Sequence, residues 1–305
     1  MIFRYEYPGG VWVDLEQPSA EEIRQVVHEF SINERIETEM LYPTPSPLVA
    51  SDEGSALLVL HFPAREADRS RTKNQEIDFV VGGHFIVTIR YEVIVPLHHL
   101  KKLLETQQLV ADHTSLATDV LLETLFAHLY TSVRNHTDQT ASDLARVERD
   151  MFDGHERTTV RLISDVSREF LHLEAALANH EEPLRRFLKM LAQRGFFGSS
   201  FTERAERIMA EHAQVAHLIV TYRAIATELR ETNLALLEAR QNEIMKTLTV
   251  ITFIFLPLEL ITFVFGMHAL GAPLEENPNA FWLITGSMLV AGVLITALVT
   301  KKRWL

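Results

Sequence analysis

Cysteine is absent from the 305 residues of this chain, which excludes disulfide bonds and thiolate metal sites. Basic residues are also in deficit, because 29 Lys and Arg stand against 41 Asp and Glu. The resulting formal charge of -12 predicts that cations, and not nucleic acid, are the natural partners. Phosphate-binding loops, nucleophile elbows, zinc-protease helices and dinucleotide fingerprints are missing too, so we expect no enzyme and no resident cofactor.

Long apolar runs are scarce, and both lie near the end of the printed sequence. Residues 248–265 read LTVITFIFLPLELITFVF, with Glu259 as the only ionisable group, and residues 281–300 contain none. As a helix, each run is about long enough to cross a hydrocarbon core of roughly 30 Å. The runs predict transmembrane helices at 248–267 and 281–300; the alternative is a soluble enzyme with two buried C-terminal helices. The N-terminal residues MIFRYEYPGG do not resemble a secretory signal.

Basic residues lie before the first run and after the second, and the loop between the two runs has none. Arg240 and Lys246 precede the first run and a basic tail at 301–305 follows the second, whereas the loop at 268–280 carries Glu275 and Glu276. By the positive-inside rule, both termini lie in the cytoplasm, and we expect a bacterial inner membrane. The external acidic loop either concentrates cations or is a solvated turn.

The part before the runs mixes two kinds of pattern. Alternating apolar residues in SALLVLHFP and NQEIDFVVGGHFIVTIRYE predict strands, with Gly82 and Gly83 at a hairpin turn, and Pro18 and Ser19 open a helix. We therefore expect an α+β cytoplasmic domain over 1–110. Helical patterns follow, in a helical region over 111–200 and a long stalk helix over 201–247. Most of the fourteen histidines are scattered singly along these patterns and are expected to be solvated or capped.

Helical compatibility runs from Glu203 to Phe265 with only Pro257 as an interruption. One stripe of this helix, at spacings of three and four, comprises Leu234, Leu237 or Glu238, Gln241, Met245, Leu248, Thr252, Leu256 and Glu259. A stripe that mixes apolar, hydroxyl and acidic side chains is unlike a lipid-facing surface. It either lines a central aqueous path or packs on a neighbouring helix with Glu259 neutral or hydrogen-bonded. Because two spans cannot enclose such a path, it requires an oligomer.

The stretch NEIMKTLTVITFIFLPLELITFVFGMH and the final KKRWL resemble the CorA superfamily of divalent-cation channels and transporters, whose zinc-transporting branch is ZntB. The matching positions are Asn242, Met245, Lys246, Leu248, Thr249, Pro257, Gly266 and Met267. The opening VWVDLEQPSAEEI is also similar to the start of family members. The order of elements matches over the whole chain, and the specific motif occupies roughly the last 65 residues.

This resemblance implies a funnel-shaped homopentamer with a pore along the first span, surrounded by membrane lipid. It implies a hydrophobic gate at Met245 and Leu248, and an outer selectivity motif at Gly266, Met267 and His268. The pore-lining positions it implies are Asn242, Met245, Leu248, Thr252, Leu256 and Glu259. Regulatory carboxylates between cytoplasmic domains are also a family property, but Arg207 stands where one partner is expected.

Two departures from the family pattern concern the choice of ion. His268 replaces the Asn of the Gly-Met-Asn motif, and Glu259 stands where a threonine is often found. An imidazole nitrogen favours Zn²⁺, Co²⁺ or Ni²⁺ over Mg²⁺, although it can also hold hydrated Mg²⁺ through water. Candidate metal-binding residues are therefore His268 and Glu259. We expect a passive or proton-coupled divalent-cation transporter; the alternative is a non-conducting scaffold or regulator of the same family.

Overall fold

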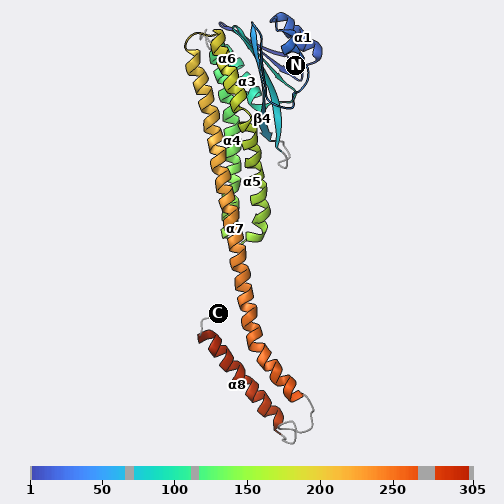
Figure 1. Cartoon of the computed structure of the whole chain (residues 1–305), viewed down its shortest axis with the longest axis vertical. Helices are drawn as coiled ribbons and strands as arrows, with labels where there is room; N and C mark the ends of the chain where they lie inside the picture. Colours follow the sequence, from blue (N-terminus) through green and yellow to red (C-terminus); the bar gives the residue numbers. More distant parts are fainter. Residues whose placement is uncertain (1, 66–71, 111–116, 267–278, 302–305) are drawn as a thin grey trace. The chain divides into compact units, whose positions relative to one another are not determined.

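The computed structural model describes residues 2–65, 72–110, 117–266 and 279–301 (Figure 1). The chain consists of two compact units, residues 1–230 and 231–305. One helix, α7 (Phe201–Gly266), contributes residues to both units and is continuous through Pro257.

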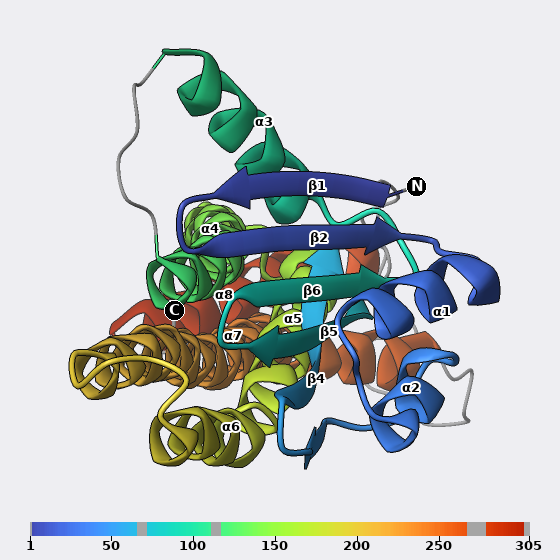
Figure 2. The same ribbon diagram turned by 90° about the horizontal axis from the view of Figure 1, so that it is seen from above.

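Unit 1 is built around a sheet of six described strands in the order β1-β2-β6-β5-β4-β3 (Figure 2). Their bounds are β1 Ile2–Tyr7, β2 Gly10–Glu16, β3 Leu48–Ser51, β4 Ser55–Arg65, β5 Thr72–Gly82 and β6 Phe85–Arg90. Among these strands, β2 pairs with β6 in parallel and the other neighbours pair antiparallel. The β5–β6 hairpin turns at the Gly82 and Gly83 positions that the sequence indicates.

Helices α1 (Ala20–Glu29) and α2 (Glu34–Met40) cover one face of this sheet. A capping box starts α1, because the Ser19 hydroxyl accepts from the Glu22 amide while the Glu22 carboxylate accepts from the Ser19 amide. Apolar side chains of α1 and α2 then meet those of the sheet in one buried core, made of Val13, Leu15, Ile23, Val26, Val27, Ile32, Ile36, Met40, Leu57, Val59, Val80, Val87 and Ile89. Burial of this apolar surface holds the layer together.

The opposite face packs against long helices. Their bounds are α3 Val95–Val110, α4 Thr118–Phe152, α5 Glu156–Ala178 and α6 Glu181–Arg194. Phe79 of β5 stacks on Phe126 of α4 with ring centroids 4.9 Å apart. Gly154 and Gly195, with φ of 91° and 65°, follow the ends of α4 and α6 in the left-handed region that glycine adopts without strain. The predicted regions 1–110 and 111–200 therefore pack against each other within one unit.

Two strands of this face carry a buried ionic cluster. Arg90 and Asp14 are fully buried on β6 and β2, and Arg90 Nη2 donates to Asp14 Oδ2 at 3.1 Å. Thr88 donates to Asp14 Oδ1 at 2.7 Å, and Lys101 of α3 forms an ion pair with the same carboxylate. Such a pair contributes little net stability, but each partner would be costly to leave alone. The cluster therefore fastens α3 to the sheet.

A second polar cluster lies on the α2 side of β5. Glu76 accepts from the amide and hydroxyl of Thr44 at 2.9 and 3.0 Å and forms an ion pair with His61 at 3.6 Å. Asp78, two residues on and facing the same side, is fully buried. Burial and the neighbouring Glu76 raise its pKa well above the usual value, although Tyr91 donates to it at 3.4 Å. Burial therefore favours the uncharged form of Asp78 up to a higher pH than usual.

Replacing Asp78 with Asn is expected to stabilise the protein at pH 8 and to change nothing at pH 4. The unfolded carboxyl ionises above about pH 4, whereas the folded one, with its raised pKa, ionises only at a higher pH. The wild type therefore loses stability as the pH rises toward the folded pKa, while an amide does not titrate. The thermal unfolding midpoint of the full chain in detergent measures this difference in stability. For domains of 150–250 residues, a change of 1 kcal/mol in the free energy of unfolding shifts the midpoint by about 2–4 °C.

The matched control for this experiment is Asp138→Asn, which removes an exposed carboxylate from α4. It should show no such pH-dependent gain. If Asp78→Asn lowers the midpoint equally at both pH values, the protonated state of Asp78 is refuted.

Candidate functional site

The mixed stripe predicted from the sequence is present on the part of α7 that belongs to unit 2. Its members are solvent-exposed in the single chain: Asn242, Met245, Leu248, Thr252, Leu256 and Glu259. At about 100° per residue, Met245, Thr252 and Glu259 fall within about 40° of one another around the helix. The stripe is therefore one continuous face.

A different face of α7 packs on α8 (Ala280–Lys301), which runs back beside it (Figure 1). Thr262 Oγ1 lies 3.7 Å from the Met288 sulfur, and a Cβ atom placed at Gly292 would lie 3.7 Å from Leu258 Cδ1. Leu258 lies about 120° around the helix from Thr252 at about 100° per residue. The contact with α8 therefore leaves the stripe uncovered.

Thr252 is oriented by its own backbone. Its hydroxyl donates to the Leu248 carbonyl at 2.9 Å, one turn back along α7. Because that bond uses the only proton of the hydroxyl, the lone pairs of the oxygen remain available on the exposed side. An oxygen held in this way can accept from a water molecule or from the hydration shell of a cation. Beside it, a groove of about 370 Å³ is lined by Leu248, Thr249, Thr252, Phe253, Leu256 and Pro257.

Glu259 lies two turns beyond Thr252 among exposed apolar residues. Leu256 and Leu260 are 59% and 60% exposed. In the described part of the chain, Glu259 forms no ion pair or hydrogen bond. A carboxylate at the centre of a membrane helix costs about 2.5–3.5 kcal/mol on insertion scales. The fold thus offers Glu259 no partner within the described subunit to offset that cost.

The outer motif falls mostly outside the described residues. Gly266 is the last residue of α7 and is exposed. Met267, His268, Glu275 and Glu276 lie in the segment 267–278, which the structure does not describe. Their assignment to selectivity and to an acidic mouth stays a prediction.

Both apolar runs form helices that are long and apolar enough to cross a membrane. Only 6% of the apolar window of α7, and none of that of α8, is buried inside the protein. A core helix of a soluble protein would be buried, so the alternative of two buried C-terminal helices is wrong for the described residues. Their exposure is consistent with an integral membrane protein.

In unit 1, Arg207 has a partner inside its own subunit. Its Nε and Nη2 donate to Glu123 of α4 at 2.5 and 3.0 Å, and Arg204 donates to Glu123 and Asp119 at 2.9 and 2.8 Å. The hydrogen bond from Arg207 is the main reason that the pKa of Glu123 lies below its usual value. The described residues bring together no group of three His, Asp or Glu that could hold a metal ion.

Three of the scattered histidines are buried, which corrects the expectation that they are solvated. They are His136, His180 and His212, with side chains from α4, the start of α6 and α7. His180 Nε2 donates to the His61 carbonyl at 3.0 Å and Nδ1 faces the Tyr130 hydroxyl at 3.4 Å. Burial lowers the pKa of His180 to about 3, so it stays neutral. The periodicity of the helices, which places His212 in the apolar stripe of Ile208, Val215 and Ile219, could have indicated this burial.

The fold and the site together define an α+β protein that ends in two exposed apolar helices, the first of which carries an uncovered polar stripe. The family model described as "CorA-like Mg2+ transporter protein" matches residues 8–303, and the chain belongs to that family. The resemblance to the CorA superfamily is thereby confirmed.

Curated relatives match along most of the chain. The "Cobalt/magnesium transport protein CorA" of Methanocaldococcus jannaschii is 23% identical over 301 residues, covering 97% of this chain and 91% of the relative. The protein of the same description in Thermotoga maritima is 32% identical over 97 residues, covering 30% of this chain and 26% of the relative.

Solved structures share the fold. The complete structure of the CorA magnesium transporter from M. jannaschii has a TM-score of 0.81 at 22% identity, covering 97% of this chain and 92% of that one. The cytoplasmic domain of ZntB from Vibrio parahaemolyticus has a TM-score of 0.60 at 10% identity, covering 77% and 89%. The predicted α+β domain followed by long helices and an apolar pair is therefore confirmed.

Proposed function

We propose that this chain is one subunit of a homopentamer that carries divalent metal cations across a membrane. The observation that supports this proposal above the others is the uncovered stripe with Thr252 and Glu259. Relatives of the chain are described as cobalt and magnesium transport proteins, which agrees with a divalent cation as the transported ion. Both termini are proposed to lie in the cytoplasm, by the distribution of basic residues.

A single α7–α8 pair cannot enclose an aqueous path, so the path must form between copies. Symmetric copies that turn the same face of α7 inward would create rings of Met245, Leu248, Thr252 and Glu259. Apolar rings of Met245 and Leu248 would act as constrictions, and the Thr252 ring would present oxygens to a hydrated ion. In this arrangement α8 covers α7 on the lipid side.

A ring of Glu259 carboxylates would titrate as a unit. Like charges held close together raise some of the pKa values of such a set, and a passing dication relieves the repulsion. The ring could therefore exchange protons for metal. An inside-negative potential supplies about 2.3 kcal/mol per charge per 100 mV, so import of a dication needs no fuel.

The choice of metal is proposed to depend on His268. Its imidazole favours Zn²⁺, Co²⁺ and Ni²⁺, whereas the Asn of the usual motif suits the outer waters of Mg²⁺. Transition metals are therefore proposed as the preferred cargo, ahead of Mg²⁺.

Replacing Glu259 with Gln should reduce metal uptake and abolish its pH dependence, because the amide keeps the shape but cannot bind a proton or pair with a dication. Uptake into proteoliposomes that hold a metal-sensitive dye, at two pH values, measures both effects. A drop of at least about tenfold would correspond to about 1.4 kcal/mol of lost stabilisation. Glu243→Gln, on the same helix before the apolar run, is the control. Unchanged flux and pH dependence in Glu259→Gln would remove Glu259 from the path.

The absence of native cysteine allows a direct test of which face of α7 is wet. Thr252→Cys should react with a charged, membrane-impermeant thiol reagent and be protected by divalent cations, whereas Leu258→Cys, on the α8 side, should not react. We expect Thr252→Cys to react at least about ten times faster than Leu258→Cys. Apolar surroundings raise the pKa of a thiol, and each unit of increase lowers the fraction of reactive thiolate about tenfold. Equal rates at the two positions would favour a non-conducting scaffold.

His268→Asn is expected to shift uptake toward Mg²⁺ and away from Zn²⁺, Co²⁺ and Ni²⁺. The same proteoliposome assay, run with each metal in turn, gives the ratio of rates. An unchanged ratio would place the choice of metal elsewhere in the protein.

A further inference from the structure

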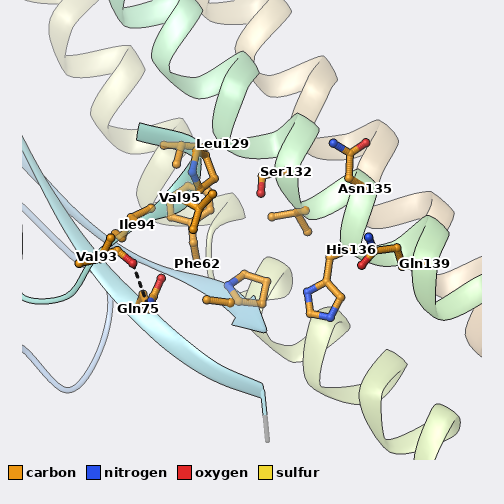
Figure 3. A pocket seen from close by; sticks show the side chains of 14 residues that line it. Phe62, Gln75, Val93, Ile94, Val95, Leu129, Ser132, Asn135, His136 and Gln139 are labelled. Atoms are coloured by element: carbon orange, nitrogen blue, oxygen red, sulfur yellow. Dashed lines mark hydrogen bonds between the residues drawn. The ribbon is translucent and has the colours of Figure 1, made fainter. Parts of the chain in front are cut away.

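Strands β4 and β5 present different side chains to the two faces of the sheet. Phe62 and Gln75, which are directly paired across the two strands, line a cavity of about 280 Å³ on the side of α4 (Figure 3). Successive side chains of a strand point to opposite faces. Their neighbours His61 and Glu76, which are also directly paired, therefore face the α2 side.

The segment 41–47, which joins α2 to β3, is anchored near its centre to this second pair. The Thr44 amide donates to both carboxylate oxygens of Glu76 at 2.9 Å, and the Thr44 hydroxyl donates to Glu76 Oε1 at 3.0 Å. The Thr44 carbonyl accepts from His61 Nε2 at 2.9 Å. Residues 43, 45 and 47 are prolines and have no amide proton to donate. Thr44 is therefore a point at which hydrogen bonds hold this segment to the sheet.

His61 and Glu76 also form an ion pair in a largely buried place. His61 Nε2 lies 3.6 Å from Glu76 Oε2, and the two side chains are 17% and 8% exposed. The hydrogen bond with Glu76 is the main reason that the pKa of His61 is raised above its usual value. Burial alone would raise the pKa of Glu76, but the hydrogen bonds from His61 and Thr44 outweigh it and lower that pKa. Both groups are therefore charged between about pH 4.5 and about pH 6.5.

Other titratable groups surround the pair, from several elements. They are Asp78 of β5, Glu39 of α2, Tyr91 after β6 and His180 before α6. Burial raises the pKa of Tyr91 and lowers that of His180 to about 3, so both are uncharged at neutral pH. Within this set of described groups, His61 is the cation that faces Glu76.

Loss of the His61 proton would weaken the hold on Thr44. Because the folded pKa of His61 is raised, the stabilisation from its charge is complete below about pH 6.5 and is lost as the pH rises through the folded pKa. The neutral imidazole can still donate to the Thr44 carbonyl, but Glu76 then lies beside Asp78 without its cation. A largely buried carboxylate is costly without such a partner.

We propose that His61 and Glu76 form a proton-sensitive latch, in which the charged pair holds the segment 41–47 against the sheet and the segment loosens when His61 loses its proton. The latch lies within unit 1 and contains none of the residues assigned to cation transport. It therefore stands or falls independently of that assignment.

A spin label in the segment tests the latch, and the absence of native cysteine allows one to be attached at a single position. Ser46→Cys places a nitroxide at an exposed residue of the segment, in the full chain in detergent. Electron paramagnetic resonance then gives the ratio of mobile to immobile label. We expect this ratio to rise at least about fivefold between pH 6 and pH 9, the effect of weakening a charge-assisted hydrogen bond. A label at Ser164→Cys, exposed on α5, should give the same ratio at both pH values.

The variant His61→Gln keeps a donor for the Thr44 carbonyl but cannot carry a charge. In this variant we expect the label at position 46 to be mobile at pH 6, with no further rise at pH 9. The matched control is His98→Gln, which removes an exposed histidine of α3 and should behave as the wild type does. Far-ultraviolet circular dichroism checks that each variant is folded.

The variant Asp78→Asn separates the latch from the titration of Asp78. It leaves His61 and Glu76 in place, so the rise in mobility between pH 6 and pH 9 should remain.

Three results would overturn the proposal. The first is a label at position 46 whose mobility does not change with pH in the otherwise wild-type chain. The second is a rise that persists in His61→Gln. The third is a rise that Asp78→Asn abolishes, which would assign the pH dependence to Asp78.

Discussion

The proposed ion path depends on which face of the last turns of α7 contacts α8. Leu258 and Thr262 face α8, and the contact leaves Thr252 and Glu259 on a face that the described subunit does not cover. In hydrocarbon an uncovered carboxylate would be costly, so its environment must be supplied by something other than lipid. Further copies of the same chain supply it most simply, since symmetry turns one acidic position into a ring.

In unit 1, by contrast with Glu259, buried charged groups find their partners within the same subunit. Asp14 and Glu16 balance the charges of Arg90 and Lys101, and burial raises the pKa of Asp78, which favours its uncharged form. The ion pair between Lys101 and Asp14 holds α3 against the sheet.

Local patterns account for what the sequence could predict. The β5–β6 hairpin, the long helix with its stripe and the two apolar helices follow from periodicity, glycine placement and run length. The edge strands β1 and β3 were not predicted, because short, partly exposed strands have weak patterns. Neither was the parallel pairing of β2 with β6, which joins segments some 75 residues apart by the Trp12–Ile86 register.

Some features of the candidate sites could likewise be predicted from local sequence patterns, and others could not. The positions of Thr252 and Glu259 on one face follow from helical spacing alone, so they could be read from the sequence. The burial of His180 depends on Phe62 and Tyr130, which come from distant elements, and no local pattern encodes that encounter.

Within unit 2, α7 is unbroken through Pro257, and this continuity keeps Met245, Thr252 and Glu259 on one face. Inserting one residue between Met245 and Thr252 would turn Thr252 and Glu259 by about 100° relative to Met245, whereas inserting seven would turn them by about 20°. Insertions in this part of the helix therefore keep the stripe on one face only when their length is close to a whole number of turns, as with about seven or eleven residues. The length of this helix segment and the direction in which its side chains point are therefore coupled.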